Sequence, residues 1–194
     1  MSGEDRRPII LASQSPQRAT LLTEAGIAFE VASPPCEEPD AAAWSGTPIE
    51  YAEYTSRLKA RSVASLHPDR VILAADTVVA LADHIIGKPA DRDDARRILT
   101  MLGGSDHEVI TGVTVLHAAG GRESTRHAIT RGRMRAMSEE ELSAYLDGGL
   151  WQGKAGAYGI QDDGDPFVTL LEGSFSNVVG LPIELVAEML APLG

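Results

Sequence analysis

One apolar run, residues 71–81, constrains the fold of this chain more than any other stretch. Its sequence, VILAADTVVAL, suits a buried strand, yet Asp76 stands in the middle of it. A carboxylate buried without a partner costs several kcal/mol. Either a partner neutralises Asp76, or the strand breaks there and Asp76 faces a site from a strand end. Lys88 follows beyond a turn that we predict at residues 82–84, so it could share a pocket with Asp76.

Short apolar runs alternate with helical stretches, which favours an α/β fold with a mixed sheet and flanking helices. Helix starts are predicted at Ser15-Pro16, at capping boxes that begin with Thr47 and Ser138, and at Asp91. The predicted strands are 9–12, 29–32, 71–81 (in two pieces), 108–118, 125–135 and 167–171. The predicted helices are 16–25, 48–66, 92–102, 139–146 and one from 182, and the predicted loops include 33–48 and 173–180.

The composition is that of a globular protein. Its 194 residues, 43% of them hydrophobic, are expected to form one domain over residues 1–194, with room for two lobes. The net charge of −11 disfavours a nucleic-acid partner. The single cysteine, Cys36, excludes an internal disulfide, and no signal peptide or membrane span is predicted. We therefore expect a soluble, cytoplasmic protein.

Residues 13–18, SQSPQR, predict a phosphate site. A strand is followed by a tight turn and a helix N-terminus, whose free backbone N–H groups and dipole attract anions. The hydroxyls of Ser13 and Ser15 and the guanidinium of Arg18 would add donors. Simple N-capping by Ser15 is the alternative interpretation of this segment, and it requires neither Ser13 nor Arg18.

Two further stretches could contribute to the same chemistry. Glu37 or Glu38 in the acidic loop could join Asp76 in binding a metal ion, since carboxylate oxygens suit Mg²⁺. The segment KAGAYGIQ, from Lys154 to Gln161, is rich in small residues that let a backbone approach a ligand closely. Gln161 could recognise a base edge through its amide. A solvated loop and a Gly-rich turn, respectively, are the structural alternatives.

Taken together, these blocks resemble the Maf family of nucleoside triphosphate pyrophosphatases. The matching stretches are LASQSPQRATLL, AADTVV with IIGKP, HEVITGVTV, KAGAYGIQ and GSFSNVVGLP, in the family's order and spacing over residues 9–183. The resemblance implies a mixed α/β fold of the inosine-triphosphatase type, with two lobes around a central cleft and usually a homodimer. It also implies hydrolysis of a nucleoside triphosphate to the monophosphate and pyrophosphate, with Mg²⁺ or Mn²⁺ as the divalent cation.

The family motifs assign roles to particular residues here. Asp76 would be the base that activates water, or would hold the metal that does so, with Glu38 as the second carboxylate and Glu37 as its alternative. The predicted substrate-binding residues are Ser13, Ser15, Arg18, Lys59, Lys88 and Lys154. These include all three lysines in a chain that otherwise uses arginine as its basic residue.

The motif KAGAYGIQ, with Thr77 after Asp76, resembles the branch of the family that acts on dTTP and UTP. Gln161 would then recognise the pyrimidine. Gln17 stands where that branch usually has an arginine, so the identity of the nucleotide depends on it. Two alternatives follow: a pyrophosphatase for modified nucleotides such as 7-methyl-GTP, and a non-catalytic nucleotide-binding regulator of cell division.

Overall fold

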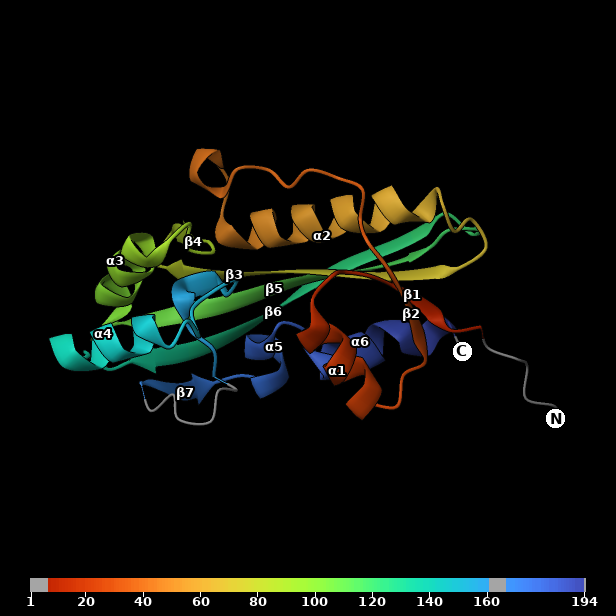
Figure 1. Ribbon diagram of the computed structural model, residues 1–194. Helices are drawn as coiled ribbons and strands as arrows, with labels where there is room; N and C mark the ends of the chain where they lie inside the picture. Colours follow the sequence, from red (N-terminus) through yellow and green to blue (C-terminus); the bar gives the residue numbers. More distant parts are fainter. Residues whose placement is uncertain (1–6, 161–166, 194) are drawn as a thin grey trace.

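The structure is a computed structural model that describes residues 7–160 and 167–193 (Figure 1). Helices and strands alternate as the sequence predicts, and short 3-10 turns (η) lie between some of them. The strands are β1 (Ile9–Ala12), β2 (Phe29–Ala32), β3 (Val71–Leu81), β4 (His84–Ile86), β5 (Asp106–His117), β6 (Arg122–Met134) and β7 (Val168–Glu172). The helices are α1 (Pro16–Glu24), α2 (Pro48–Ala64), α3 (Arg92–Leu102), α4 (Glu139–Asp147), α5 (Phe175–Val179) and α6 (Ile183–Leu190), with η1 (Ala41–Ala43), η2 (Ala155–Ala157) and η3 (Ala191–Leu193).

Within the described residues the strands form one seven-stranded mixed sheet. The order is β2-β1-β3-β5-β6-β7, and β4 pairs with β3 off this path. The strand β1 is parallel to β2 and β3, while the other pairings are antiparallel. The expected α/β fold with a mixed sheet and flanking helices is therefore confirmed.

Alternation along β3 divides its side chains between two helical layers. Ile72 and Ala74 pack against Ala60 and Val63 of α2. Leu73 and the other odd-numbered residues nearby pack on the opposite face, where Leu22 of α1 and Val186 of α6 complete a second cluster. Figure 1 shows α2 on one side of the long strands and α1, α5 and α6 on the other. Even-numbered residues of β3 therefore face α2, and odd-numbered residues face the opposite layer, in which Leu73 and Ala75 pack near α1 and Val79 packs near α3 and α4.

A close contact between α2 and β5 places the helix on the sheet. Gly112 of β5 lies opposite Asp76 of β3, and a Cβ atom on Gly112 would lie 2.4 Å from the carbonyl carbon and oxygen of Ala52. Any larger residue would push α2 away from the strand. The start of α2 is fixed by the predicted capping box, in which Thr47 accepts from the backbone N–H of Glu50 and the Glu50 carboxylate accepts from that of Thr47.

Two local predictions are wrong. The strand at 71–81 is continuous, because Asp76 stays paired in the ladder opposite Gly112 instead of breaking it. The predicted loop at 173–180 contains the short helix α5, held by the buried side chain of Asn177, whose Nδ2 donates to the Val109 carbonyl at 3.0 Å. Ser15 occupies the N-cap position of α1, but its side chain makes no capping hydrogen bond.

The remaining helix predictions hold, with differences of one or two residues at the ends. Asp91 caps α3 by accepting from the Asp94 N–H, and Ser138 begins the second capping box at α4. None of the helices in the described part of the chain is long and apolar enough to cross a membrane.

Candidate functional site

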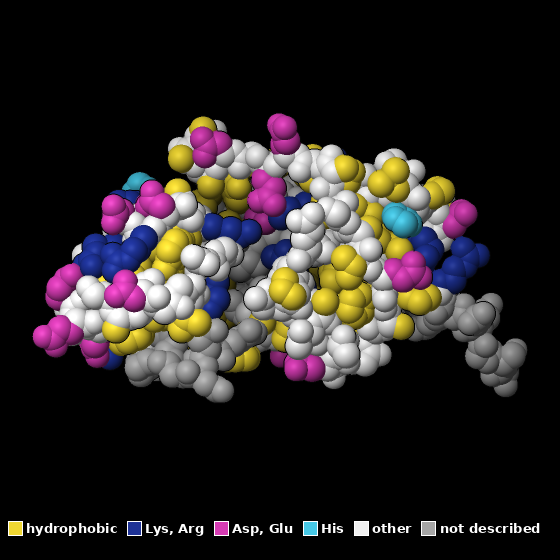
Figure 2. All heavy atoms as spheres, in the orientation of Figure 1, with side chains coloured by type: hydrophobic (Ala, Val, Ile, Leu, Met, Phe, Trp, Pro, Cys, Tyr) yellow, Lys and Arg dark blue, Asp and Glu magenta, His cyan; other side chains and the backbone are white. Residues whose placement is uncertain are grey.

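The candidate site lies where the edge of β3 changes its neighbour. Along this edge of β3, β1 pairs with Ile72 and Leu73, and β4 pairs with Val79–Leu81. Asp76 and Thr77 lie in the interval between these two pairings, next to the carboxyl end of β1, the end of a parallel strand at which α/β proteins bind ligands. Figure 2 shows this face of the molecule hollowed in the middle, with Lys and Arg side chains inside the hollow and acidic side chains at its upper edge.

The ammonium group of Lys59 joins two carboxylates on the α2 side of this interval. Its Nζ lies 2.7 Å from Oδ1 of Asp76 and 2.8 Å from Oε1 of Glu38. Lys59 is 8% exposed and Asp76 is 7% exposed, whereas half of the Glu38 side chain reaches solvent. Of the two explanations that the sequence leaves open for Asp76, neutralisation by a partner is the one observed. The carboxylate that contacts Lys59 is that of Glu38 and not that of Glu37.

Positive charge surrounds Glu38. Desolvation raises the pKa of its carboxyl, but the hydrogen bond from Lys59 and the charges of Lys59, Lys88 and Arg18 lower it, and the net shift is downward. Lys88 is exposed and follows β4, and the hairpin brings it within electrostatic range of Glu38. The site therefore holds Glu38 as a carboxylate at neutral pH. The pocket predicted to be shared by Lys88 and Asp76 stays a prediction.

Arg18 lies on the opposite side of the interval. Its guanidinium donates to Oγ of Ser13 at 3.2 Å, to Oγ1 of Thr77 at 3.1 Å and to the Gly180 carbonyl at 2.8 Å. Burial lowers the pKa of Arg18, while the charges of Asp76 and Glu38 raise it, with a net lowering. Because Asp76 and Thr77 point to opposite faces of β3, the carboxylate is held from α2 and the guanidinium from α1.

The sequence interpretation missed the hydrogen bonds that hold the Arg18 side chain and its partner Thr77 in place. Thr77 shares a hydrogen bond with Thr111 at 2.9 Å between their Oγ1 atoms, and Thr111 also donates to the Asn177 carbonyl. Gly180, at a φ of 123°, follows α5 and presents its carbonyl to Arg18. Thr111, Asn177 and Gly180 belong to the motifs HEVITGVTV and GSFSNVVGLP, which carried the family resemblance but indicated no contact between them.

The Gly-rich segment lies beside the Lys88 turn. The backbone N–H of Gly156 donates to the Gly87 carbonyl at 3.1 Å, which places Lys154 and Lys88 on adjoining segments. Gly156 has a φ of 73°, and a Cβ there would lie 2.9 Å from Val79. This glycine therefore allows the backbone to pass close to Val79, while the predicted approach of the segment to a ligand stays a prediction. Gln161 lies outside the described residues.

Ser15 and Gln17 lie apart from the Lys59 cluster. Ser15 Oγ donates to Oε1 of Gln17 at 3.0 Å, and the Gln17 side chain is exposed on the first turn of α1. Gln17 instead lines a groove of about 720 Å³ between α1 and α5, together with Phe175. The role predicted for Gln17 in nucleotide choice and that of Ser15 in phosphate binding stay predictions.

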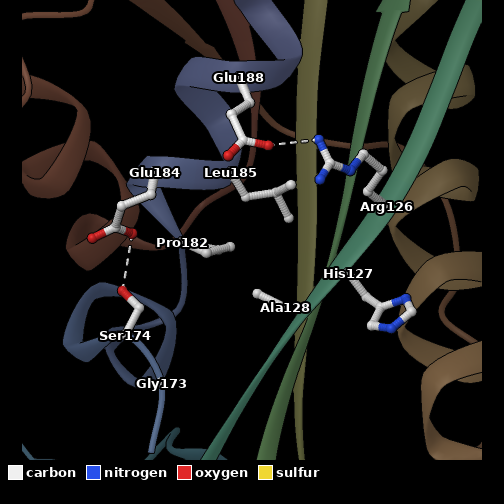
Figure 3. Close-up of a pocket in the computed structure, with 9 residues that line it drawn as sticks. All are labelled: Arg126, His127, Ala128, Gly173, Ser174, Pro182, Glu184, Leu185 and Glu188. Carbon is white, nitrogen blue, oxygen red and sulfur yellow. Dashed lines mark hydrogen bonds and ion pairs between the residues drawn. The ribbon is translucent and has the colours of Figure 1, made fainter.

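A second surface pocket, of about 450 Å³, lies between β6 and α6 (Figure 3). Arg126 and Glu188 form an ion pair on one side of it, and Ser174 donates to Glu184 on another, so these four polar side chains are engaged with one another. Neither this pocket nor the α1–α5 groove is lined by Asp76 or Lys59. The cluster of Lys59, Asp76 and Glu38 therefore lies outside both pockets.

The carboxylate pair fits a cation that is shared with a substrate. Among the described residues no group of three His, Cys, Asp or Glu side chains could hold a metal ion without help. Asp76 and Glu38 nevertheless direct oxygens to one point, the Lys59 ammonium. Mg²⁺ is usually bound by one or two carboxylates together with phosphate oxygens and water. This donor set is thus suited to a divalent cation that arrives with, or is completed by, a phosphate ligand.

Comparisons with family models, with named proteins and with solved structures each found proteins similar to this chain. A family model described as Maf-like protein matches residues 8–193. A dTTP/UTP pyrophosphatase of Nitratidesulfovibrio vulgaris is 48% identical, over 94% of this chain and 87% of the relative. Proteins of the same name from Cereibacter sphaeroides (42% identical, 96% and 95% covered) and Pelotomaculum thermopropionicum (39%, 97% and 97%) are also similar. A solved HAM1 protein from Coxiella burnetii aligns at 16% identity with a TM-score of 0.44, over 66% of this chain and 72% of that chain.

Proposed function

The chain belongs to the Maf family, and we propose that it is a nucleoside triphosphate pyrophosphatase that hydrolyses dTTP and UTP. The relatives that cover most of this chain carry that activity in their names. The observation that carries the proposal for this chain is the Lys59 cluster, in which a buried carboxylate and a half-exposed carboxylate share one ammonium at an open strand edge.

The site has the charges that this reaction needs. A triphosphate carries several negative charges, and an overall acidic protein repels it. Lys59, Lys88 and Arg18 concentrate positive charge around Glu38, which shares the Lys59 ammonium with Asp76, and Ser13 adds a hydroxyl that already contacts the Arg18 guanidinium. Phosphoryl-type reactions depend mainly on positioning and charge stabilisation, which such an arrangement supplies.

In the proposed reaction a water molecule attacks the α-phosphorus. Asp76 accepts the water proton as the new bond between oxygen and the α-phosphorus forms, and the bond from the α-phosphorus to the bridging oxygen breaks. That oxygen leaves with the β- and γ-phosphates as pyrophosphate. Lys88, Arg18 and Lys154 bind the phosphate oxygens, and Lys59 orients the Asp76 carboxylate before the attack.

Asp76 and Glu38 are the residues that would hold a divalent cation, Mg²⁺ or Mn²⁺. When bound, such a cation supplies positive charge to the phosphates and lowers the pKa of a water molecule. Its two carboxylate ligands would come from different segments, β3 and the loop before α2, so the position of that loop matters for its affinity.

A nucleotide panel tests the proposal. The purified protein is incubated with Mg²⁺ or Mn²⁺ and with dTTP, UTP, the other common triphosphates and 7-methyl-GTP, and pyrophosphate is resolved from orthophosphate. Pyrophosphate from dTTP and UTP is the expected result, and it would show that Gln17 is tolerated. Pyrophosphate from 7-methyl-GTP alone would support the modified-nucleotide enzyme instead. Binding of nucleotide without release of pyrophosphate would support the regulator.

We also expect a homodimer of single-domain chains in the cytoplasm, with no nucleic-acid or membrane partner. Light scattering of the purified protein tests the dimer, and fractionation of cells tests the compartment.

A further inference from the structure

Tyr51, in the first turns of α2, connects this helix to the acidic loop. Its side chain is buried, and its hydroxyl donates to the Pro39 carbonyl at 2.8 Å. The ring also packs edge-on against Trp44, with 5.4 Å between the ring centroids. Figure 1 shows the segment between β2 and α2, in orange, passing above this helix. Tyr51 thus holds that segment by both an apolar and a polar contact.

The residue held by Tyr51 directly follows Glu38. A proline ring fixes the rotation between its own nitrogen and Cα. Only the rotation between Cα and the carbonyl carbon of Pro39 therefore separates the Glu38 peptide bond from the Pro39 carbonyl. A hydrogen bond to the Pro39 carbonyl therefore also restrains the backbone of Glu38. The Glu38 carboxylate, 2.8 Å from Lys59, is the half-exposed member of the cluster and is the member carried by a loop.

The Tyr51 hydroxyl is suited to remain a donor. Burial raises its pKa, and the negative charges of Asp76 and Glu38 raise it further, to about 12. The hydroxyl is therefore protonated at every pH at which the protein would work. The hydroxyl donates to a backbone oxygen and not to either carboxylate.

We infer that Tyr51 is a positioning residue of the reaction centre, which holds Glu38 over Lys59 through the Pro39 carbonyl. This inference rests on the proposed function for its consequence in catalysis. Loss of the hydroxyl would let the loop move and would weaken the second carboxylate of the proposed cation site. The residue has no contact with substrate in this account and acts through Glu38.

The matched variants are Tyr51→Phe and Tyr54→Phe. Tyr54 lies one turn further along α2, and its ring also packs on Trp44 at 5.4 Å, but half of its surface is exposed. Tyr51→Phe should lower kcat/KM for dTTP about tenfold at limiting Mn²⁺, with partial recovery at saturating Mn²⁺. Tyr54→Phe should keep wild-type values at both concentrations. Equal losses in the two variants, or no loss in Tyr51→Phe, would overturn the inference.

A double-mutant cycle with Glu38→Gln separates positioning from general stability. If Tyr51 acts through Glu38, Tyr51→Phe should cause less than about a twofold further loss once Glu38→Gln is present. Full additivity of the two losses would mean that Tyr51 acts independently of Glu38, and the inference would be wrong. Thermal unfolding of each variant shows whether any of the loss reflects the fraction of folded protein.

Amide hydrogen exchange tests the same inference without any activity. The backbone N–H groups of Ala42, Ala43 and Trp44 are hydrogen-bonded in and around η1. Tyr51→Phe should speed their exchange about tenfold while Tyr54→Phe leaves it unchanged. If the wild-type protein releases no pyrophosphate, the proposed function fails, but faster exchange would still support Tyr51 as the anchor of the loop. Unchanged exchange in Tyr51→Phe would overturn the anchor itself.

Discussion

Two sets of oppositely charged pairs lie along the same central strands. Lys59 of α2 and Asp76, at the middle of β3, are almost completely buried between the helix and the strand. At the start of β5, Arg133 of β6 lies opposite Asp106, and Arg131 lies opposite Glu108, and all four side chains are substantially exposed. Both sets join neighbouring elements by short contacts, but they differ in access to water.

That difference in solvation decides what each set can do. Exposed pairs lose little water when they form, and they contribute little to stability. A buried pair requires desolvation of both charges, which its Coulomb attraction repays only partly, so such a pair is weak evidence for stability. Buried charge at Lys59 and Asp76 is better explained by a need for charge at that place, which accords with the proposed reaction centre.

The largest expected effect is on turnover in Asp76→Asn. The amide can still accept a hydrogen bond from Lys59, so the fold should remain, but the base is lost and kcat for dTTP should fall about a thousandfold. Pyrophosphate release and thermal unfolding, measured side by side, check both halves. Turnover near that of the wild type would remove Asp76 from the mechanism.

Lys59→Met should have the largest effect on stability. It leaves Asp76 buried without its partner, so the free energy of unfolding in urea should fall by about 3 kcal/mol. The double variant Lys59→Met/Asp76→Asn no longer buries a lone charge and should recover most of that loss. If the double variant is no more stable than Lys59→Met, desolvation of Asp76 is not the cause.

Gly112→Ala tests the close approach that buries the Lys59 cluster. Its Cβ would lie 2.4 Å from the Ala52 backbone, so α2 must shift, and the free energy of unfolding should fall by about 2 kcal/mol. Gly87→Ala is the control, because a Cβ at Gly87 would have no atom within 4 Å apart from those of its two chain neighbours. Similar unfolding curves for the two variants would mean that α2 tolerates the displacement.

The smallest expected effect is that of Arg133→Gln, in the exposed set. Its contact with Asp106 is screened by water, so thermal unfolding and activity should stay within measurement error of the wild type. The hydrogen bond from Arg133 lowers the pKa of Asp106. Any contribution of this pair is therefore present above the ordinary carboxyl pKa and lost as pH falls through the lowered one.

High salt compares the two sets in one experiment. About 1 M NaCl shortens the screening length to a few ångströms, which should remove any effect of Arg133→Gln and leave that of Lys59→Met nearly unchanged. A large salt dependence of the effect of Lys59→Met would show that water reaches Asp76.

Local sequence signals account for most of the secondary structure. Capping boxes at Thr47 and Ser138 and the cap at Asp91 are interactions within a few residues, so their positions follow directly from the sequence. The same locality explains the wrong prediction at 173–180. The helix α5 is short, and buried contacts of Asn177 with distant strands hold it, which no local pattern reveals.

The sequence by itself determined the α/β fold class, the family and the set of charged residues worth testing, because periodicity, caps and motif order are properties of the chain in one dimension. Only the tertiary structure decided which charges meet. Lys59 lies on a helix, Glu38 on a loop and Asp76 on a strand, and the close packing at Gly112 brings them together. Alternation along an unbroken β3 then separates the carboxylate from Arg18 on the opposite face.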